Sequence, residues 1–185
     1  VDFARRRDLI RSSIVAQGEK LNASTVVDEA LLDEVTSLVE YPVALTGRFD
    51  ELFLEVPSEA LILAMKSHQK CFYLLDKDQK LLPYFVTVSN IRSTDPAQVI
   101  EGNERVIRPR LADAKFFYET DQNSSLESRL EQLKKVVFQE KLGTVYERSV
   151  RVAKLAAFIA KDSGEDESQA QRAAMLSKCD LVSNM

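Results

Sequence analysis

Residues 101–121 read EGNERVIRPRLADAKFFYETD and separate two parts of the chain that differ in composition. All five prolines lie at or before Pro109, and the residues that follow contain none. A long proline-free stretch rich in Ala, Leu, Glu, Lys and Arg is typical of packed helices, whereas the first part mixes helix and strand patterns. The sequence therefore predicts an α+β chain with a mixed module over residues 1–122 and a helical domain over residues 123–185.

Apolar periodicity predicts the elements of the first part. Helices are expected over residues 1–21, 28–40 and 59–68, the last capped by Ser58, and strands over 43–46, 52–56, 71–75 and 84–88, with a turn at Gly47. Asp95 and Pro96 signal the start of another helix, because Asp caps a first turn and Pro fits into it. We expect this helix to be interrupted near Gly102 or Pro109 and to resume through Leu111–Tyr118.

The second part has the pattern of a helical domain. Ser124 and Glu127 have the spacing of a capping box. The apolar residues that follow fall on one helical stripe, made of Leu126, Leu130, Leu133 and Val137. Further helices are expected over residues 144–161 and 166–185, with an acidic turn between them.

Residue counts exclude several kinds of catalytic site. His68 is the only histidine, so motifs with two histidine metal ligands are excluded. The five glycines form neither G-x-G-x-x-G nor a Walker loop. Cys71 and Cys179 form no zinc pair or disulfide framework, which suits a reducing cytoplasm, and no apolar run reaches the roughly 18 residues of a membrane helix. We expect no catalytic residue, metal or cofactor in this chain, and no contact with a membrane.

Charge is unevenly distributed along a chain whose net charge is -4. Residues 19–60 hold two basic side chains against ten acidic ones. Between residues 105 and 115, Asp113 is the only acid, against the basic residues Arg105, Arg108, Arg110 and Lys115. These four, with Lys66 and Lys70 beside His68, are candidates for binding RNA phosphates, which arginine contacts in bidentate fashion. The alternative is a solvated helix with salt bridges.

Two segments of the second part resemble the metal-binding helices of HD-type phosphohydrolases. Arg148 stands where the first histidine would be, and the His-Asp dyad falls on Ser177-Lys178 or on Cys179-Asp180. Neither register supplies a histidine, so an HD-like domain here is expected to be catalytically empty. We also expect Asp180 to be buried against Arg148 or Arg151, which would replace the metal as counter-charge.

Short blocks that resemble one known family run in order from about residue 25 to the end of the chain. They are LLDEV at 31–35, EYPV at 40–43, VPSEAL at 56–61, MK at 65–66, QK at 69–70, LLPYF at 81–85, GNERV at 102–106, RPRLADA at 108–114, FF at 116–117, LGT at 142–144, LSKCDL at 176–181 and NM at 184–185. In these blocks the chain resembles an internal segment of the β subunit of bacterial glycyl-tRNA synthetase, the heterotetrameric α2β2 type.

The resemblance implies a place in glycine–tRNA ligase, a cytoplasmic aminoacyl-tRNA synthetase. In that family the α subunit uses ATP and Mg²⁺ to make glycyl-adenylate and transfers glycine to tRNA, whereas the β subunit is needed for tRNA binding and for the active assembly. The resemblance also implies a module similar to the B3/B4 part of phenylalanyl-tRNA synthetase, followed by a degenerate HD domain. The implied partners are the α subunit, a second β subunit and tRNA-Gly.

Two hypotheses remain open at the level of sequence. The first is a non-catalytic segment of the ligase that supports tRNA binding and assembly. The second is a helical interaction scaffold whose basic residues meet protein and not RNA. Salt dependence separates the two, because phosphate contacts make affinity fall steeply with salt.

Overall fold

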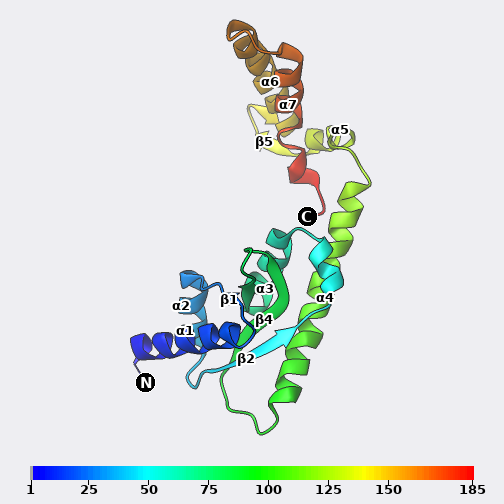
Figure 1. The fold of residues 1–185 in the computed structure, drawn as a ribbon. Helices are drawn as coiled ribbons and strands as arrows, with labels where there is room; N and C mark the ends of the chain where they lie inside the picture. The colour runs from blue at the N-terminus through cyan, green and yellow to red at the C-terminus, as the bar shows by residue number, and fades with distance from the viewer. Residues whose placement is uncertain (1) are drawn as a thin grey trace. The chain divides into compact units, whose positions relative to one another are not determined.

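The computed structural model describes residues 2–185 and combines helices with two antiparallel sheets (Figure 1). The α+β class predicted from the sequence is confirmed. Packing divides the chain into two compact units, of which unit 1 ends at Phe116 and unit 2 begins at Phe117. The division falls inside helix α4 (Pro96–Gln122), whereas the boundary predicted from the sequence lies at the end of that helix. No helix among the described residues is long and apolar enough to cross a bilayer.

Unit 1 is built on a four-stranded antiparallel sheet. Its strands lie in the order β1 (Ser24–Thr25), β3 (Phe72–Leu75), β4 (Leu81–Ser89) and β2 (Val43–Arg48). The helices of this unit are α1 (Phe3–Glu19), α2 (Glu29–Leu38), α3 (Ser58–Gln69), the first part of α4, and the 3-10 helix η1 (Glu51–Glu55). The predicted helices and the strands β2, β3 and β4 are therefore confirmed in position.

The core of unit 1 lies between α1, α2 and one face of the sheet. Its fully buried members are Ile10 and Ile14 of α1, Leu32 of α2, and Phe72, Leu74 and Val86 of the sheet. Successive side chains of a strand point to opposite faces. Val86 of β4 therefore packs on this core, whereas its neighbour Phe85 is buried on the other face.

Gly47 of β2 leaves room for the ring of Phe85. The two residues are paired in the β2–β4 register, and a Cβ built on Gly47 would lie 2.3 Å from Cζ of Phe85. Any side chain at residue 47 would therefore displace the ring of Phe85. The predicted turn at Gly47 is wrong, because β2 continues through Arg48.

The predicted strand over residues 52–56 is also wrong, since these residues belong to η1 and its C-cap. Asp50 caps this helix by accepting a hydrogen bond of 3.0 Å from the Leu52 N–H. Phe53 and Val56 are buried three residues apart, which is the period of a 3-10 helix and not the two-residue period of a strand. Ser58 does not cap α3, because Pro57 occupies the cap position without a side-chain hydrogen bond.

Helix α4 is continuous from Pro96 to Gln122, so the predicted interruption near Gly102 or Pro109 is wrong. The Gln98 N–H donates to the Asp95 carboxylate over 3.3 Å, which confirms Asp95 as the cap. Pro109 removes one N–H from the helix. Ile107 and Leu111 are fully buried on either side of it, and this burial holds the helix in place against the local preference of proline.

Unit 2 contains helices and a two-stranded hairpin, so the description of this part as all-helical is wrong. Its elements are α5 (Leu126–Arg129), η2 (Gln132–Lys135), β5 (Val137–Gln139), β6 (Gly143–Thr144), α6 (Val145–Asp162), α7 (Glu167–Leu176) and η3 (Cys179–Val182). Helices α6 and α7 pack against each other (Figure 1). The predicted capping box at Ser124 is displaced, because Ser125 accepts the bond from the Ser128 N–H and caps α5.

The end of α4 and the last residues of the chain meet at Asp121. Its carboxylate accepts hydrogen bonds of 2.8 Å from Arg129, 2.9 Å from the Asn184 N–H and 3.0 Å from the Met185 N–H. Burial raises the pKa of Asp121, but the hydrogen bonds from Asn184 and Met185 outweigh it, so that this pKa lies below its usual value. The carboxylate is therefore charged at neutral pH and joins both ends of unit 2.

The contact between Gly47 and Phe85 gives a testable prediction. Gly47→Ala forces a methyl group into the Phe85 ring and should destabilise unit 1 by about 1–3 kcal/mol, as overpacking of a core does. Hydrogen exchange of peptides from β2 and β4 measures this loss in the intact protein. Gly102→Ala is the matched control, because a Cβ there meets nothing within 4 Å. In the helix it should stabilise by about 0.5–1 kcal/mol. Equal protection in both variants would contradict the packing argument.

Candidate nucleic-acid interface

The six basic residues proposed as RNA contacts all lie in unit 1, in two places. Helix α4 carries Arg105, Arg108, Arg110 and Lys115, and the end of α3 carries Lys66 and Lys70. Their surroundings differ in one respect that matters for binding an anion. Some of these cations are already paired with a carboxylate, and others are not.

On α4 the basic residues do not form one cluster. Ile107 and Leu111 are buried and mark the inner face of the helix. Successive helical residues are about 100° apart, so Arg108 and Arg110 project about 160° apart, on opposite flanks of this inner face. Arg105 lies on the same side as Arg108. Although these basic residues are close in the sequence, their charges therefore lie on different sides of the helix and do not form one patch.

Two of the α4 cations are paired within unit 1. Nζ of Lys115 lies 2.7 Å from the Glu55 carboxylate, and the Lys115 side chain is only 19% exposed. Arg105 pairs with Glu101 over 3.0 Å, one helical turn away, at a fully solvated position where such a pair contributes little. Among the described residues, neither Arg108 nor Arg110 has an acidic partner, and both are exposed.

The lysines at the end of α3 are paired with α2. Lys66 Nζ lies 2.5 Å from Asp28, and Lys70 Nζ lies 2.8 Å from Glu34, beside a pocket of about 280 Å³ that these side chains line. Asp28 also caps α2, since it accepts a hydrogen bond of 2.9 Å from the Leu31 N–H. The bonds from Lys66 and then from Leu31 lower the pKa of Asp28 below its ordinary value. These two lysines thus join α3 to α2.

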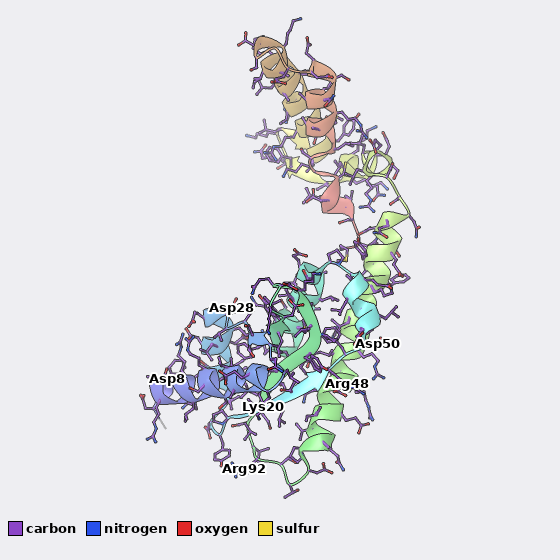
Figure 2. The ribbon with its side chains drawn as sticks, viewed as in Figure 1. Asp8, Lys20, Asp28, Arg48, Asp50 and Arg92 are labelled. Carbon is purple, nitrogen blue, oxygen red and sulfur yellow. The ribbon has the colours of Figure 1, made fainter. Side chains whose placement is uncertain are left out.

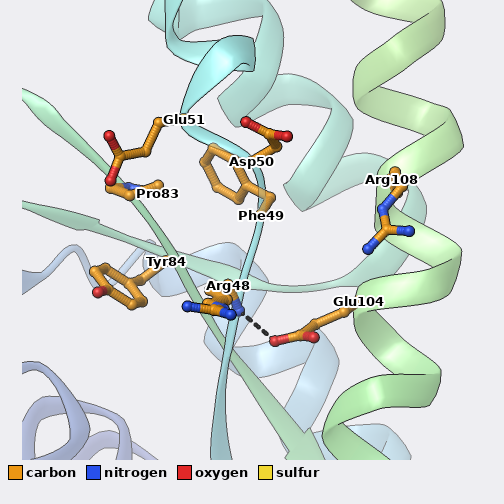
Figure 3. A pocket seen from close by; sticks show the side chains of 8 residues that line it. All are labelled: Arg48, Phe49, Asp50, Glu51, Pro83, Tyr84, Glu104 and Arg108. Atoms are coloured by element: carbon orange, nitrogen blue, oxygen red, sulfur yellow. Dashed lines mark hydrogen bonds between the residues drawn. The ribbon is translucent and has the colours of Figure 1, made fainter.

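A second pocket, of about 370 Å³, lies at the end of β2 beside α4 (Figure 3). It is lined by Arg48 and Phe49 at the end of β2, Asp50 and Glu51 at the start of η1, Pro83 and Tyr84 of β4, and Glu104 and Arg108 of α4. Figure 3 shows Glu104 and Arg108 on the α4 side and Glu51 and Tyr84 on the opposite side. The pocket therefore gathers two guanidinium groups, three carboxylates and two aromatic rings.

Main-chain contacts on both sides fix Arg48 in this pocket. Arg48 is the last residue of β2 (Figure 2). It lies opposite Tyr84 in the sheet register. Its N–H donates to the Glu104 carboxylate over 2.8 Å, and the next N–H, of Phe49, donates to the Pro83 carbonyl over 3.0 Å. Arg48 was not among the site residues predicted from the sequence. It is an isolated cation in an acidic stretch, and its contact with α4 spans 56 residues.

The positions of unit 2 that resemble an HD dyad are not gathered into a site. The Arg148 guanidinium lies over the Phe138 ring, 4.5 Å from its centroid, and Arg151 donates to the Leu142 carbonyl over 3.2 Å. Ser177, Lys178 and Asp180 are exposed, whereas Cys179 is fully buried and its pKa is raised by desolvation.

The predicted burial of Asp180 against Arg148 or Arg151 is wrong. The prediction assumed one helix from residue 166 to residue 185, but α7 ends at Leu176 and η3 begins at Cys179. This break turns Cys179 into the core beside Leu133 and leaves Asp180 in solvent. Within residues 2–185, no group of three or more His, Cys, Asp or Glu side chains could hold a metal ion.

Comparison with known proteins identifies the family. The sequence profile of the family described as "Glycyl-tRNA synthetase beta subunit" matches residues 1–185. The chain belongs to this family. It is 57% identical over 185 residues to the glycine–tRNA ligase beta subunit of Marinobacter nauticus, and 57% identical over 184 residues to that of Chromohalobacter salexigens. Each alignment covers 100% of this chain and 27% of the relative, so the chain spans about a quarter of their length. The resemblance drawn from the sequence blocks is confirmed.

The pairing of Lys66 with Asp28 gives a pH-dependent prediction. The folded pKa of Asp28 lies below its ordinary value of 3.8, so the pair stabilises unit 1 above pH 3.8 and this contribution is lost as the pH falls through the folded pKa. Asp28→Asn keeps a capping side chain but removes the charge. The melting temperature of the variant should therefore be lower at neutral pH and approach that of the unchanged protein in acid. A difference of the same size at every pH, from neutral to acid, would mean that capping, and not the ion pair, accounts for the loss.

Proposed function

We propose that this chain is a non-catalytic segment of a glycine–tRNA ligase β subunit and that it supports both tRNA-Gly binding and assembly with the α subunit. The whole protein would then act in the cytoplasm as half of an α2β2 aminoacyl-tRNA synthetase, with ATP and Mg²⁺ used on the α subunit. Membership of the family and the names of the relatives support this proposal.

The exposed Arg110 carries the RNA part of the proposal. Lys66, Lys70, Arg105 and Lys115 each have a carboxylate partner, whereas Arg110 has none among the described residues. An unpaired guanidinium on an exposed helix is free to form a bidentate contact with a phosphate. In a chain with a net charge of -4, such a contact is local and does not reflect general attraction to nucleic acid.

Arg110→Ala in the complete enzyme tests this contact. If Arg110 binds a phosphate, the slope of log affinity for tRNA-Gly against log salt should flatten by about 0.7–0.9, while the melting temperature stays nearly constant. The preferred tRNA should not change, because phosphate contacts carry little sequence information. Filter binding over a range of salt concentrations measures the slope.

Lys115→Ala is the matched control for Arg110→Ala. It removes a positive charge from the same helix, but this cation is paired with Glu55 and mostly buried. The control should lower the melting temperature and leave the salt slope unchanged. The same pattern in Arg110→Ala would assign that residue to structure and remove the support for RNA binding by this helix.

A stripe of exposed apolar residues on α6 supports the assembly part of the proposal, and it also favours the alternative of an interaction scaffold. The stripe consists of Val152, Leu155, Phe158 and Ile159, of which Leu155 is 59% and Phe158 67% exposed. Ala153 and Ala160, which are buried, mark the inner face of the helix. A contiguous apolar patch of this kind marks a contact with another protein surface.

Leu155→Ser combined with Phe158→Ser tests this surface. Apolar anchors at the centre of an interface contribute about 2 kcal/mol or more each, so the double variant should weaken the α–β association by about 100-fold or more. Mass photometry of the diluted complex measures the association. Lys154→Ser, an exposed change on the same helix, should have no effect. A lower melting temperature of the isolated β subunit with unchanged association would show that β itself covers the stripe.

A further inference from the structure

We propose that the pocket at the end of β2 receives an unpaired nucleobase of the tRNA, held by the guanidinium groups of Arg48 and Arg108 and by the Glu51 carboxylate. The inference rests on the proposed function, because it specifies which part of the RNA unit 1 contacts. It is independent of Arg110, which does not line the pocket.

The size and lining of the pocket fit a base. A volume of about 370 Å³ lies within the roughly 300–1,000 Å³ of small-molecule pockets in proteins. Tyr84 is half-buried at one side of the pocket, and the Arg48 side chain lies beside it, from the neighbouring strand (Figure 3). Aromatic rings and guanidinium planes are the groups on which proteins stack the splayed bases of single-stranded RNA.

The charges of the pocket favour a base over a phosphate. Asp50, Glu51 and Glu104 outnumber Arg48 and Arg108, and a phosphate would be repelled by three carboxylates. A base is neutral and presents N–H donors beside oxygen or nitrogen acceptors. Carboxylates accept hydrogen bonds from such donors, and guanidinium groups donate to such acceptors. A pocket lined by both kinds of group can therefore recognise the hydrogen-bonding edge of a base.

The hydrogen bonds of the pocket show which carboxylate is available. Glu104 accepts the Arg48 N–H, and Asp50 accepts the Leu52 N–H. Within residues 2–185, no group donates to the exposed Glu51 carboxylate. Glu51 is therefore the acceptor for the N–H groups of a base, and Arg108, which also has no acidic partner among the described residues, is the donor. All four bases present both kinds of group on their Watson–Crick edges, so the identity of the bound base is left to experiment.

Glu51→Gln in the complete enzyme separates a base from a phosphate. If the pocket binds a base, loss of the charged acceptor weakens tRNA-Gly binding about 5-fold or more, with the salt slope unchanged. If it binds a phosphate, removal of a repelling charge strengthens binding. Glu59→Gln makes the same change on unit 1 outside the pocket and should bind within a factor of about two of the unchanged enzyme, because distant exposed charges are screened by salt.

A second measurement identifies the base. Each unpaired nucleotide of the tRNA is replaced in turn, and each variant tRNA is tested with the unchanged enzyme and with Glu51→Gln. At the bound position, the replacement and Glu51→Gln should together weaken binding no more than either does alone, whereas at other positions the two losses multiply. Binding by Glu51→Gln that is equal to or tighter than that of the unchanged enzyme, or losses that multiply at every position, would overturn the proposal.

The outcomes also separate this inference from the proposed function. A flattened salt slope in Arg110→Ala together with a silent Glu51→Gln would leave tRNA binding by α4 in place and remove only the base pocket. If the salt slope is unchanged in Arg110→Ala and Glu51→Gln binds tRNA like the unchanged enzyme, both RNA binding at Arg110 and the base pocket are rejected. Weakening by Glu51→Gln alone would place the RNA contact of unit 1 at the pocket and not at Arg110.

Discussion

The geometry of unit 1 depends on the contact between Phe85 and the bare backbone of Gly47. Because β2 has no side chain there, the ring of its partner strand lies across it, and the two strands stay paired up to Arg48 and Tyr84. The chain then turns into η1 at a defined point, next to α4. The pocket at the end of β2 therefore begins one residue beyond this packing contact, where the Arg48 N–H donates to Glu104.

Carboxylates in and beside α2 neutralise basic side chains of the neighbouring helices of unit 1. Glu29 pairs with Arg7 and Arg11 of α1, and these guanidinium groups lower the pKa of Glu29 to about 2. Asp28 and Glu34 hold the lysines of α3 in the same way. A strongly acidic stretch of sequence thus becomes a set of internal contacts. Among the described residues, the side chains of Arg48, Arg108 and Arg110 have no carboxylate partner and are able to meet an external anion or base.

Helix periodicity and capping residues were sufficient to predict most of unit 1, because its helices bury one regular stripe each. The errors occur where local preference and tertiary burial disagree. Pro109 predicts an interruption, but Ile107 and Leu111 are buried around it and the helix continues. Alternating Leu52 and Leu54 predict a strand, but the cap at Asp50 and burial three residues apart produce a 3-10 helix. The pocket itself was beyond prediction, since it joins residues from β2, β4 and α4 that are far apart in sequence.

The cluster around Asp121 makes one side chain responsible for closing a long loop of the chain. Its carboxylate ties residue 121 to residues 184 and 185, which lie 63 and 64 positions further along the sequence. Helices α5, α6 and α7 all lie within the loop that these hydrogen bonds close. Because the bonds converge on a single carboxylate, a substitution at this one residue would remove all of them together.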